Sequence, residues 1–450
     1  MSSLKQIIRP LLHARAATEL LAGGGGGGLG CSHAGSWTWT RHMSMASMKN
    51  WDPAQFKPRK AVILTKVSRY EYEKIQNEKM SERQLEEMLT KRGSDYTMIR
   101  YHHNVHKALE QEVVHGLEGA GMEVKVVKRY QYNDEVVKWA DLIVTTGGDG
   151  TFLMGSSKIL NRNKPILGIN TDPTRSEGHL CLPKHYSFNI QEAIDAIFRG
   201  KFKWFFRRRL RVTLIGLKEK INEAPVELHD QQLQYPEYRY MDLMTENADA
   251  GDHPFKEPIA RENTAQQHTR ILPVFGLNEI YIGESLSSRV SYLELQIDKE
   301  PAFKTRNSGL CIATGTGSTS WTFNINKLTH HAVESLLKII YETTKYSLNW
   351  KDPKLVEAIT QKFNNQLVFD PEADVMCYTL RDAISVGTFP TAKENRPRGT
   401  AKRMIVKSKC FDACLVIDGS LSFKFNDGAK AIIDILEEDA LRTFQLYSEL

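Results

Sequence analysis

The residues best suited to chemistry lie in one short turn, Gly147–Gly150, between the apolar run Ala140–Thr146 and a helical pattern that begins at Thr151. Glycine lets a backbone approach a ligand closely, and the amides at the start of a helix point toward an anion. We therefore predict a phosphate site made of Gly147, Gly148, Gly150 and Thr151. The Asp149 carboxylate can orient a hydroxyl group and accept its proton as a general base. The alternative interpretation is an ordinary strand-to-helix turn in which the aspartate caps the helix.

Alternating strand and helix patterns must hold this turn in place. β-Branched apolar runs predict strands at Ala61–Val67, Asp95–Tyr101, Met122–Arg129, Ala140–Thr146 and Pro165–Asn170. Helical patterns lie between them at Arg69–Arg92, Val105–Ala120, Asn133–Lys138 and Thr151–Leu160. The alternation predicts an α/β nucleotide-binding domain over residues 60–200, with a doubly wound parallel sheet and a ligand site at the carboxyl ends of its strands.

Beyond about Phe202 the pattern changes to strands with few helices, which predicts a mostly antiparallel β domain over residues 201–425. Two polar segments interrupt it and are interpreted as insertions, at about residues 220–270 and 336–374. We expect the first to be a surface loop and the second to contain helices at His331–Thr344 and Pro353–Asn365. A final helix, Ala429–Leu446, is predicted within residues 426–450.

The glycine-rich turn resembles that of a group of kinases, which includes NAD kinases, diacylglycerol and sphingosine kinases and, more distantly, phosphofructokinases. Two downstream runs, GLNEIYIGE and SGLCIATGTGSTSW (Ser308–Trp321), resemble NAD kinase motifs in order and spacing. GINTDPTRSEGHLCL (Gly168–Leu182) and ACLVIDGS (Ala413–Ser420) resemble two further motifs. Over roughly Ala61–Phe425 the chain therefore resembles the NAD kinase family, and within it the mitochondrial NAD kinases of animals.

The resemblance implies roles for individual residues of the β-rich domain. In the family, the asparagine and glutamate of the first motif contact the ribose hydroxyls and the base of NAD, and the second motif lines the dinucleotide pocket. It therefore assigns NAD binding to Phe152, Asn278, Glu279, Ser308, Thr316, Thr319, Ser320 and Trp321. Asn170 and Thr171 follow a strand at the same sheet edge and are assigned to nucleotide phosphate, with a turn role as the alternative.

Several positions depart from the family pattern. Ser308 stands where an aspartate is common, Gly315 replaces a proline, and Ser420 replaces a frequent glutamine. The motif GINTGHLGFL is expanded here by six residues after Thr171. Trp321 replaces the usual tyrosine, and it either stacks on a ring of the nucleotide or belongs to the core.

The implied reaction is attack by the adenosine 2′-hydroxyl of NAD on the γ-phosphorus of ATP, with Mg²⁺ or another divalent cation accompanying ATP. The resemblance also implies a homo-oligomer, most simply a dimer. Two other functions stay open, a lipid kinase and a protein that binds NAD(H) or NADP without turnover. ATP and polyphosphate are both open as donors, and so is NADH as an acceptor.

The composition favours neither a nucleic-acid partner nor a membrane. The first fifty residues account for +4 of the formal net charge of +6, which leaves +2 for the rest of the chain. For the local run Arg207–Arg211, a sheet edge or a structural ion pair is favoured over a phosphate site. No apolar run reaches the roughly 20 residues that span a bilayer. The six cysteines show neither disulfide nor metal spacing.

The first fifty residues differ from the rest of the chain. A basic, apolar, potentially helical segment with the single acid Glu19 precedes a run of six glycines. This pattern predicts a mitochondrial transit peptide over residues 1–50 and a location in the mitochondrial matrix. The alternative is a tail that carries no targeting signal.

Overall fold

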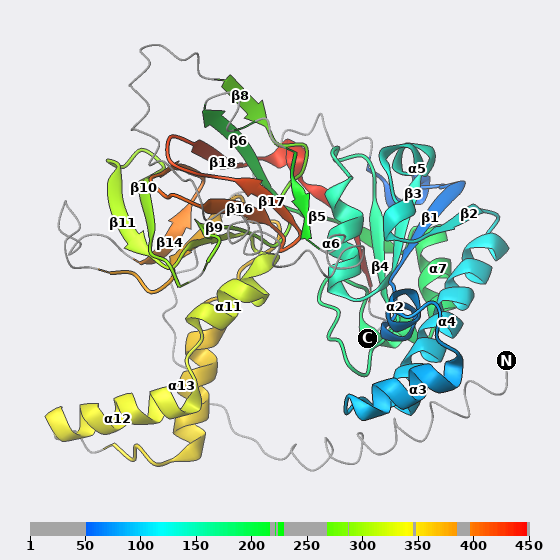
Figure 1. Ribbon diagram of the computed structural model, residues 1–450, viewed down its shortest axis with the longest axis horizontal. Coiled ribbons are helices and arrows are strands. Elements are labelled where there is room, and N and C mark those ends of the chain that lie inside the picture. Colours follow the sequence, from blue (N-terminus) through cyan, green and yellow to red (C-terminus); the bar gives the residue numbers. More distant parts are fainter. Residues whose placement is uncertain are drawn as a thin grey trace, which may run out of the picture. The chain divides into compact units, whose positions relative to one another are not determined.

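The structure is a computed structural model that describes residues 51–216, 221, 224–228, 268–286, 288–344, 348–384 and 397–447 (Figure 1). The predicted transit peptide, residues 1–50, lies outside the described residues, as does most of the first predicted insertion.

A parallel sheet with the strand order β2-β1-β3-β4 holds the glycine-rich turn. Its strands are β1 (Lys60–Thr65), β2 (Glu123–Val127), β3 (Leu142–Gly147) and β4 (Ile166–Asn170). The central strands β1 and β3 are almost entirely buried, as expected of strands covered on both faces. The register pairs Thr65 with Thr146 and Gly147 with Asn170, so the carboxyl ends of β1, β3 and β4 meet at one edge. The predicted parallel sheet is confirmed.

Helices cover both faces of this sheet (Figure 1). They are α2 (Arg69–Gln76), α3 (Glu82–Lys91), α4 (Tyr96–Gly119), α5 (Asp134–Trp139), α6 (Asp149–Ser157) and α7 (Ile190–Phe198). On one face, α4 and α7 bury Leu109 and Ile194 in a core with Ile63. On the other, α5 and α6 bury Val137 and Phe152.

Two predicted elements of this region are wrong. The predicted strand Asp95–Tyr101 is the start of α4, and Asp95 caps this helix by accepting a hydrogen bond from the Met98 N–H at 3.0 Å. Tyr96 packs with Leu85 of α3, a contact that the helical conformation supports. The single helix predicted over Arg69–Arg92 is two helices, because a capping box at Ser81 starts α3 separately.

Two antiparallel sheets follow. The six-stranded sheet has the order β11 (Phe303–Asn307), β10 (Ser291–Ile297), β15 (Arg403–Ser408), β18 (Lys430–Ile435), β6 (Leu210–Gly216) and β8 (His268–Ile271). The seven-stranded sheet has the order β14 (Arg398–Ala401), β13 (Met376–Leu380), β12 (Leu310–Ala313), β9 (Glu279–Glu284), β16 (Ala413–Ile417), β17 (Leu421–Lys424) and β7 (Val226–Glu227). Apolar residues of both sheets, such as Val212 and Ile282, form one core. The predicted antiparallel β architecture is confirmed.

The predicted C-terminal helix Ala429–Leu446 is wrong, because this segment forms β18 and β19 (Leu441–Leu446). Ala431, Ile433 and Ile435 are buried at alternate positions, which is the period of a strand. Strand β19 pairs with β5 (Phe202–Arg207), and an isolated parallel bridge joins Arg442 to Pro165. The chain therefore ends beside the parallel sheet.

Three further helices are α11 (Trp321–Asn326), α12 (His330–Thr344) and α13 (Pro353–Asn365), so both helices predicted in the second insertion are confirmed. The ends of the first predicted insertion are not loop, because β7 and β8 pair with the two antiparallel sheets. Within the described ranges, no helix is both long enough and apolar enough to cross a membrane.

Candidate active site

The glycine-rich turn joins β3 to α6 at the carboxyl edge of the parallel sheet. Gly148 precedes the helix, and the N–H of Thr151 donates to the Gly148 carbonyl at 3.0 Å. A Cβ atom added at Gly147 would lie 2.2 Å from Oγ1 of Thr151, so only glycine fits at that position. The turn brings the first amides of α6 to the sheet edge, as the predicted phosphate site requires.

Asp149 is the first residue of α6, and its carboxylate binds a neighbouring loop rather than its own helix. The carboxylate accepts hydrogen bonds from the N–H groups of Leu180 at 2.8 Å and His179 at 3.1 Å. The helix-cap alternative is therefore wrong, since the cap position belongs to Gly148. A carboxylate offers about four acceptor sites, so capacity remains for a substrate hydroxyl.

A pocket of 740 Å³ opens beside the turn. Its lining combines apolar side chains, basic side chains and the turn itself, and includes Leu64, Lys66, Val67, Arg69, Tyr72, Arg129, Gly148, Gly150, Thr151, Leu153, Met154 and Asp418–Ser420. Basic groups and helix amides suit phosphate, and the apolar side chains suit a nucleobase. Three of the four predicted phosphate residues, Gly148, Gly150 and Thr151, therefore line one pocket.

Asp418 connects this pocket to the predicted NAD motifs. Its carboxylate accepts hydrogen bonds from the N–H groups of Leu277 at 2.9 Å, Asn278 at 2.8 Å and Glu279 at 3.1 Å. These bonds fix the backbone of the Asn278–Glu279 motif. Sequence analysis assigned no role to Asp418, although an aspartate directly after an apolar strand was the signal that marks it.

Glu279 and Asn278 present unusual polar groups. Burial, together with the charge of Asp418, raises the pKa of Glu279 to about 8. At neutral pH this carboxyl group is therefore mostly protonated and can donate as well as accept a hydrogen bond. Beside it, Oδ1 of Asn278 is buried and has no hydrogen-bond partner within the described part of the chain. Buried polar atoms are normally paired, so this oxygen is a candidate ligand contact.

The Gly- and Thr-rich motif lies directly against this pair. A Cβ atom added at Gly317 would lie 2.1 Å from the carbonyl oxygen of Asn278, so the two backbones are in contact. The Ser320 hydroxyl donates to the Glu279 carboxylate at 3.5 Å. Thr319 donates to the carbonyl of Thr316 within the same turn, at 3.3 Å. The structure thus brings these predicted NAD residues together from two distant motifs.

Arg207 joins the two halves of the site, a role that the sequence did not indicate. Its guanidinium donates to Oγ1 of Thr316 at 3.4 Å and to the carbonyl of His179 at 3.5 Å. His179 in turn binds Asp149. Burial lowers the pKa of Arg207 to about 10, which leaves the guanidinium charged at neutral pH.

Trp321 is not a core residue, because 37% of its surface is exposed. Its ring centroid lies 5.3 Å from that of Tyr281, and the guanidinium carbon of Arg381 lies 5.3 Å from the Trp321 centroid. Tyr281 also donates its hydroxyl hydrogen to the carbonyl of Ser308 at 2.9 Å. The tryptophan therefore offers an accessible aromatic surface near the predicted NAD residues, next to Ser308.

Curated proteins with similar sequences decide the family. The human protein named NAD kinase 2, mitochondrial, is 40% identical over 394 residues, which cover 87% of this chain and 85% of that protein. The Xenopus tropicalis protein of the same name is 37% identical and covers 87% of this chain and 91% of its own length. This chain belongs to the NAD kinase family. The family model described as ATP-NAD kinase N-terminal domain matches residues 62–202, and yeast NADH kinase complexed with NADH aligns over 87% of this chain and 84% of that chain, with 13% identity and a TM-score of 0.45.

Two groups of predicted site residues of this NAD kinase family member have other contacts. The prediction that Phe152 contacts NAD is wrong for this structure, because its ring is fully buried in the core beneath the parallel sheet. Asn170 holds its own loop, accepting a hydrogen bond from the Asp172 N–H and donating to the Ser176 carbonyl, both at 3.0 Å. Thr171 bonds to His106 at 2.9 Å. The turn alternative for Asn170 and Thr171 therefore describes their observed contacts.

The residues around the pocket fit a divalent cation that arrives with ATP. Among the described residues, no group of three or more His, Cys, Asp or Glu side chains could hold a metal ion. Mg²⁺ usually keeps several waters and binds through one or two carboxylates and substrate phosphates. The nucleotide phosphates would hold the ion here, and the ion would neutralise charge on their oxygens.

Proposed function

We propose that this chain transfers the γ-phosphoryl group of ATP to the adenosine 2′-hydroxyl of NAD, which yields NADP and ADP. The observation that carries the proposal is the position of Asp149, a carboxylate with free acceptor capacity on the glycine-rich turn that lines the 740 Å³ pocket. The Asn278–Glu279 motif, which Asp418 connects to the same pocket, is the proposed NAD contact.

In the proposed step, Asp149 accepts the proton of the 2′-hydroxyl as its oxygen bonds to the γ-phosphorus and the bond to ADP breaks. The amides of Gly148, Gly150 and Thr151 bind phosphate oxygens. Asn278, Glu279 and the Thr316–Trp321 turn orient the acceptor. Phosphoryl transfer needs little covalent help from a protein, so positioning and charge stabilisation supply most of the catalysis.

The test is NADP formation by the purified full-length chain with a panel of substrates. We expect NADP from NAD and ATP with Mg²⁺. Polyphosphate in place of ATP, and NADH in place of NAD, test the donor and the acceptor separately. Binding of NAD without formation of NADP under all of these conditions would favour a binding protein instead.

Replacement of Trp321 by alanine is expected to raise the KM for NAD by roughly 2- to 10-fold, because an exposed aromatic stacking surface is lost. The KM for ATP should change little. Trp139→Ala is the matched control, since Trp139 also carries a cation on its ring, with Lys125 Nζ 3.8 Å from the centroid, but lies in α5. Equal effects on the two KM values would assign Trp321 a structural role.

We further propose that the chain works in the mitochondrial matrix and supplies the NADP(H) pool there. The basic, acid-poor leader supports this location, and the human and rat relatives carry the name NAD kinase 2, mitochondrial. A fusion of residues 1–60 to a fluorescent protein is expected to enter mitochondria, and a cytosolic fusion would contradict the proposal. A homodimer is proposed from the family resemblance, and light scattering of the purified chain tests it.

A further inference from the structure

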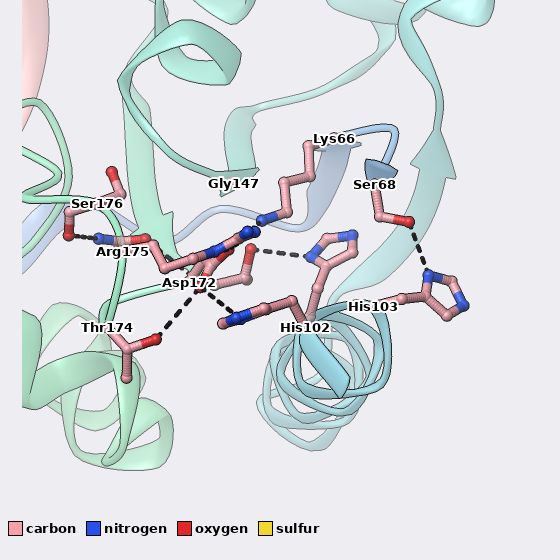
Figure 2. A network of polar contacts seen from close by, with 12 residues as sticks. Lys66, Ser68, His102, His103, Gly147, Asp172, Thr174, Arg175 and Ser176 are labelled. Carbon is pink, nitrogen blue, oxygen red and sulfur yellow. Dashed lines mark hydrogen bonds and ion pairs between the residues drawn. The ribbon is translucent and has the colours of Figure 1, made fainter. Parts of the chain in front are cut away.

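A polar cluster lies beside the phosphate-binding turn and includes a lysine that faces the pocket (Figure 2). Lys66 follows β1 directly, and its backbone N–H donates to the Thr146 carbonyl at 3.0 Å. A Cβ atom added at Gly147 would lie 3.2 Å from Cβ of Lys66. The lysine therefore starts next to the glycine turn, and its side chain lines the pocket with Gly148 and Thr151.

Asp172 binds the polar heads of this cluster. Arg175 donates to its Oδ2 atom from Nε at 3.0 Å and from NH2 at 2.6 Å. Lys66 Nζ lies at 3.4 Å from the same oxygen, and His102 Nδ1 lies at 3.3 Å from Oδ1. The Lys66 contact is thus longer than both arginine contacts.

Both Asp172 and Arg175 belong to the six-residue expansion that distinguishes this chain from the family motif. Asn170 closes the expanded loop through its bonds to Asp172 and Ser176. A Cβ atom added at Gly148 would lie 3.0 Å from the Ser176 hydroxyl, so the expansion reaches the phosphate-binding turn. The loop therefore places a carboxylate and a second cation beside Lys66.

The charges leave this cluster positive. Burial lowers the pKa of His102, which keeps its imidazole neutral at neutral pH. Lys66 and Arg175 then carry two positive charges against the single negative charge of Asp172. Because Arg175 already pairs with Asp172 through two short contacts, the ammonium can turn toward the pocket without leaving the carboxylate unpaired. An ammonium has three donors and binds phosphate as a compact charge.

We propose that Lys66 binds the phosphate chain of the donor nucleotide at the glycine-rich turn, and that Asp172, paired with Arg175, positions the lysine. The inference rests on the proposed kinase function and adds a donor contact to it. It also gives the expanded loop a role, because the loop supplies the groups that hold Lys66 at the pocket.

The test compares K66M, K66R and D172N in the full-length protein, with K128M as the matched control. Lys128 is also partly buried and ion-paired, with Nζ at 3.1 Å from Glu71 Oε1. Loss of a charged hydrogen bond predicts a fall in kcat/KM for ATP of about 10- to 100-fold in K66M. K66R should restore part of this loss. D172N should raise the KM for ATP with little change in the KM for NAD, a split that general loosening of the fold would not produce.

Isothermal titration with ATP and Mg²⁺ separates this inference from the proposed function. Weaker ATP binding by K66M than by K128M supports the donor contact whatever the acceptor is. A wild-type protein that binds ATP but makes no NADP overturns the proposed acceptor only. An active wild type with K66M within twofold in both ATP binding and kcat/KM overturns the role of Lys66. If K66M does not fold, K66R and D172N decide, and unchanged ATP parameters in both would overturn the inference.

Discussion

Replacement of Asp149 by asparagine is expected to lower kcat by roughly 10²–10⁴-fold, the range that general-base assistance contributes. Asparagine keeps the size of the side chain and one acceptor oxygen, but it cannot take the proton of the 2′-hydroxyl. The affinity for NAD should change little, because the proposed NAD contacts come from other elements. Steady-state kinetics and NAD titration of the purified variant measure both quantities.

The chain contains a matched control for this variant. Asp141 also accepts two backbone N–H hydrogen bonds, from Arg59 at 2.9 Å and Lys60 at 3.0 Å, but it lies where β3 begins, at the opposite edge of the sheet. Asp141→Asn therefore repeats the structural loss without the chemical one, and its kcat should stay near the wild-type value. A folded Asp149→Asn protein that works within threefold of the wild-type rate would show that Asp149 is not the base, and Glu279 would be the next candidate.

Arg209→Ala is expected to lower the free energy of unfolding by about 3–5 kcal/mol, although Arg209 lies outside the pocket lining. Arg209 is only 1% exposed, and it donates to the carbonyls of Asp439 at 2.6 Å and Ile159 at 2.5 Å. Its guanidinium carbon also lies 4.6 Å from the ring centroid of Phe275. Alanine would leave two carbonyls unpaired and a cavity between the end of α6 and the strands. Denaturant unfolding measures the loss.

Arg403→Ala is the control for this effect. Arg403 pairs with Asp434 at 3.3 Å but is 55% exposed, and an exposed ion pair contributes about 0–1 kcal/mol. Arg209→Met separates the two causes, because methionine fills part of the space without donating hydrogen bonds. An Arg209→Ala protein as stable as Arg403→Ala would show that the buried guanidinium is not needed for the fold.

The fate of the run Arg207–Arg211 illustrates the limit of local reasoning. The sequence favoured a sheet edge or a structural ion pair over a phosphate site. Arg211 fits this, since it pairs with Asp439 at 2.5 Å. The burial of Arg209 and the contact of Arg207 with Thr316 could not be predicted, because their partners come from segments far away in the chain. Charge in a sequence does not reveal which side chain the tertiary fold will enclose.

The sequence by itself determined the parts that depend on neighbouring residues. Apolar runs of strand length fixed β1, β3 and β4, and the glycines of the turn reported a close backbone approach that Gly147 indeed requires. The order of the motifs also indicated the family, which the similarity to curated proteins establishes.

Only the tertiary structure decided the elements whose partners lie elsewhere in the chain. The segment Leu441–Leu446 is a strand because Phe202–Arg207 offers it a ladder beside the parallel sheet, whereas its local pattern had suggested a helix. Asp418 became part of the site because three backbone N–H groups of another strand's approach converge on its carboxylate. Lys66 likewise gained Asp172 and Arg175 from a loop that follows a different strand. Hydrogen bonds and ion pairs depend on distances in space, and a sequence pattern reports only distances along the chain.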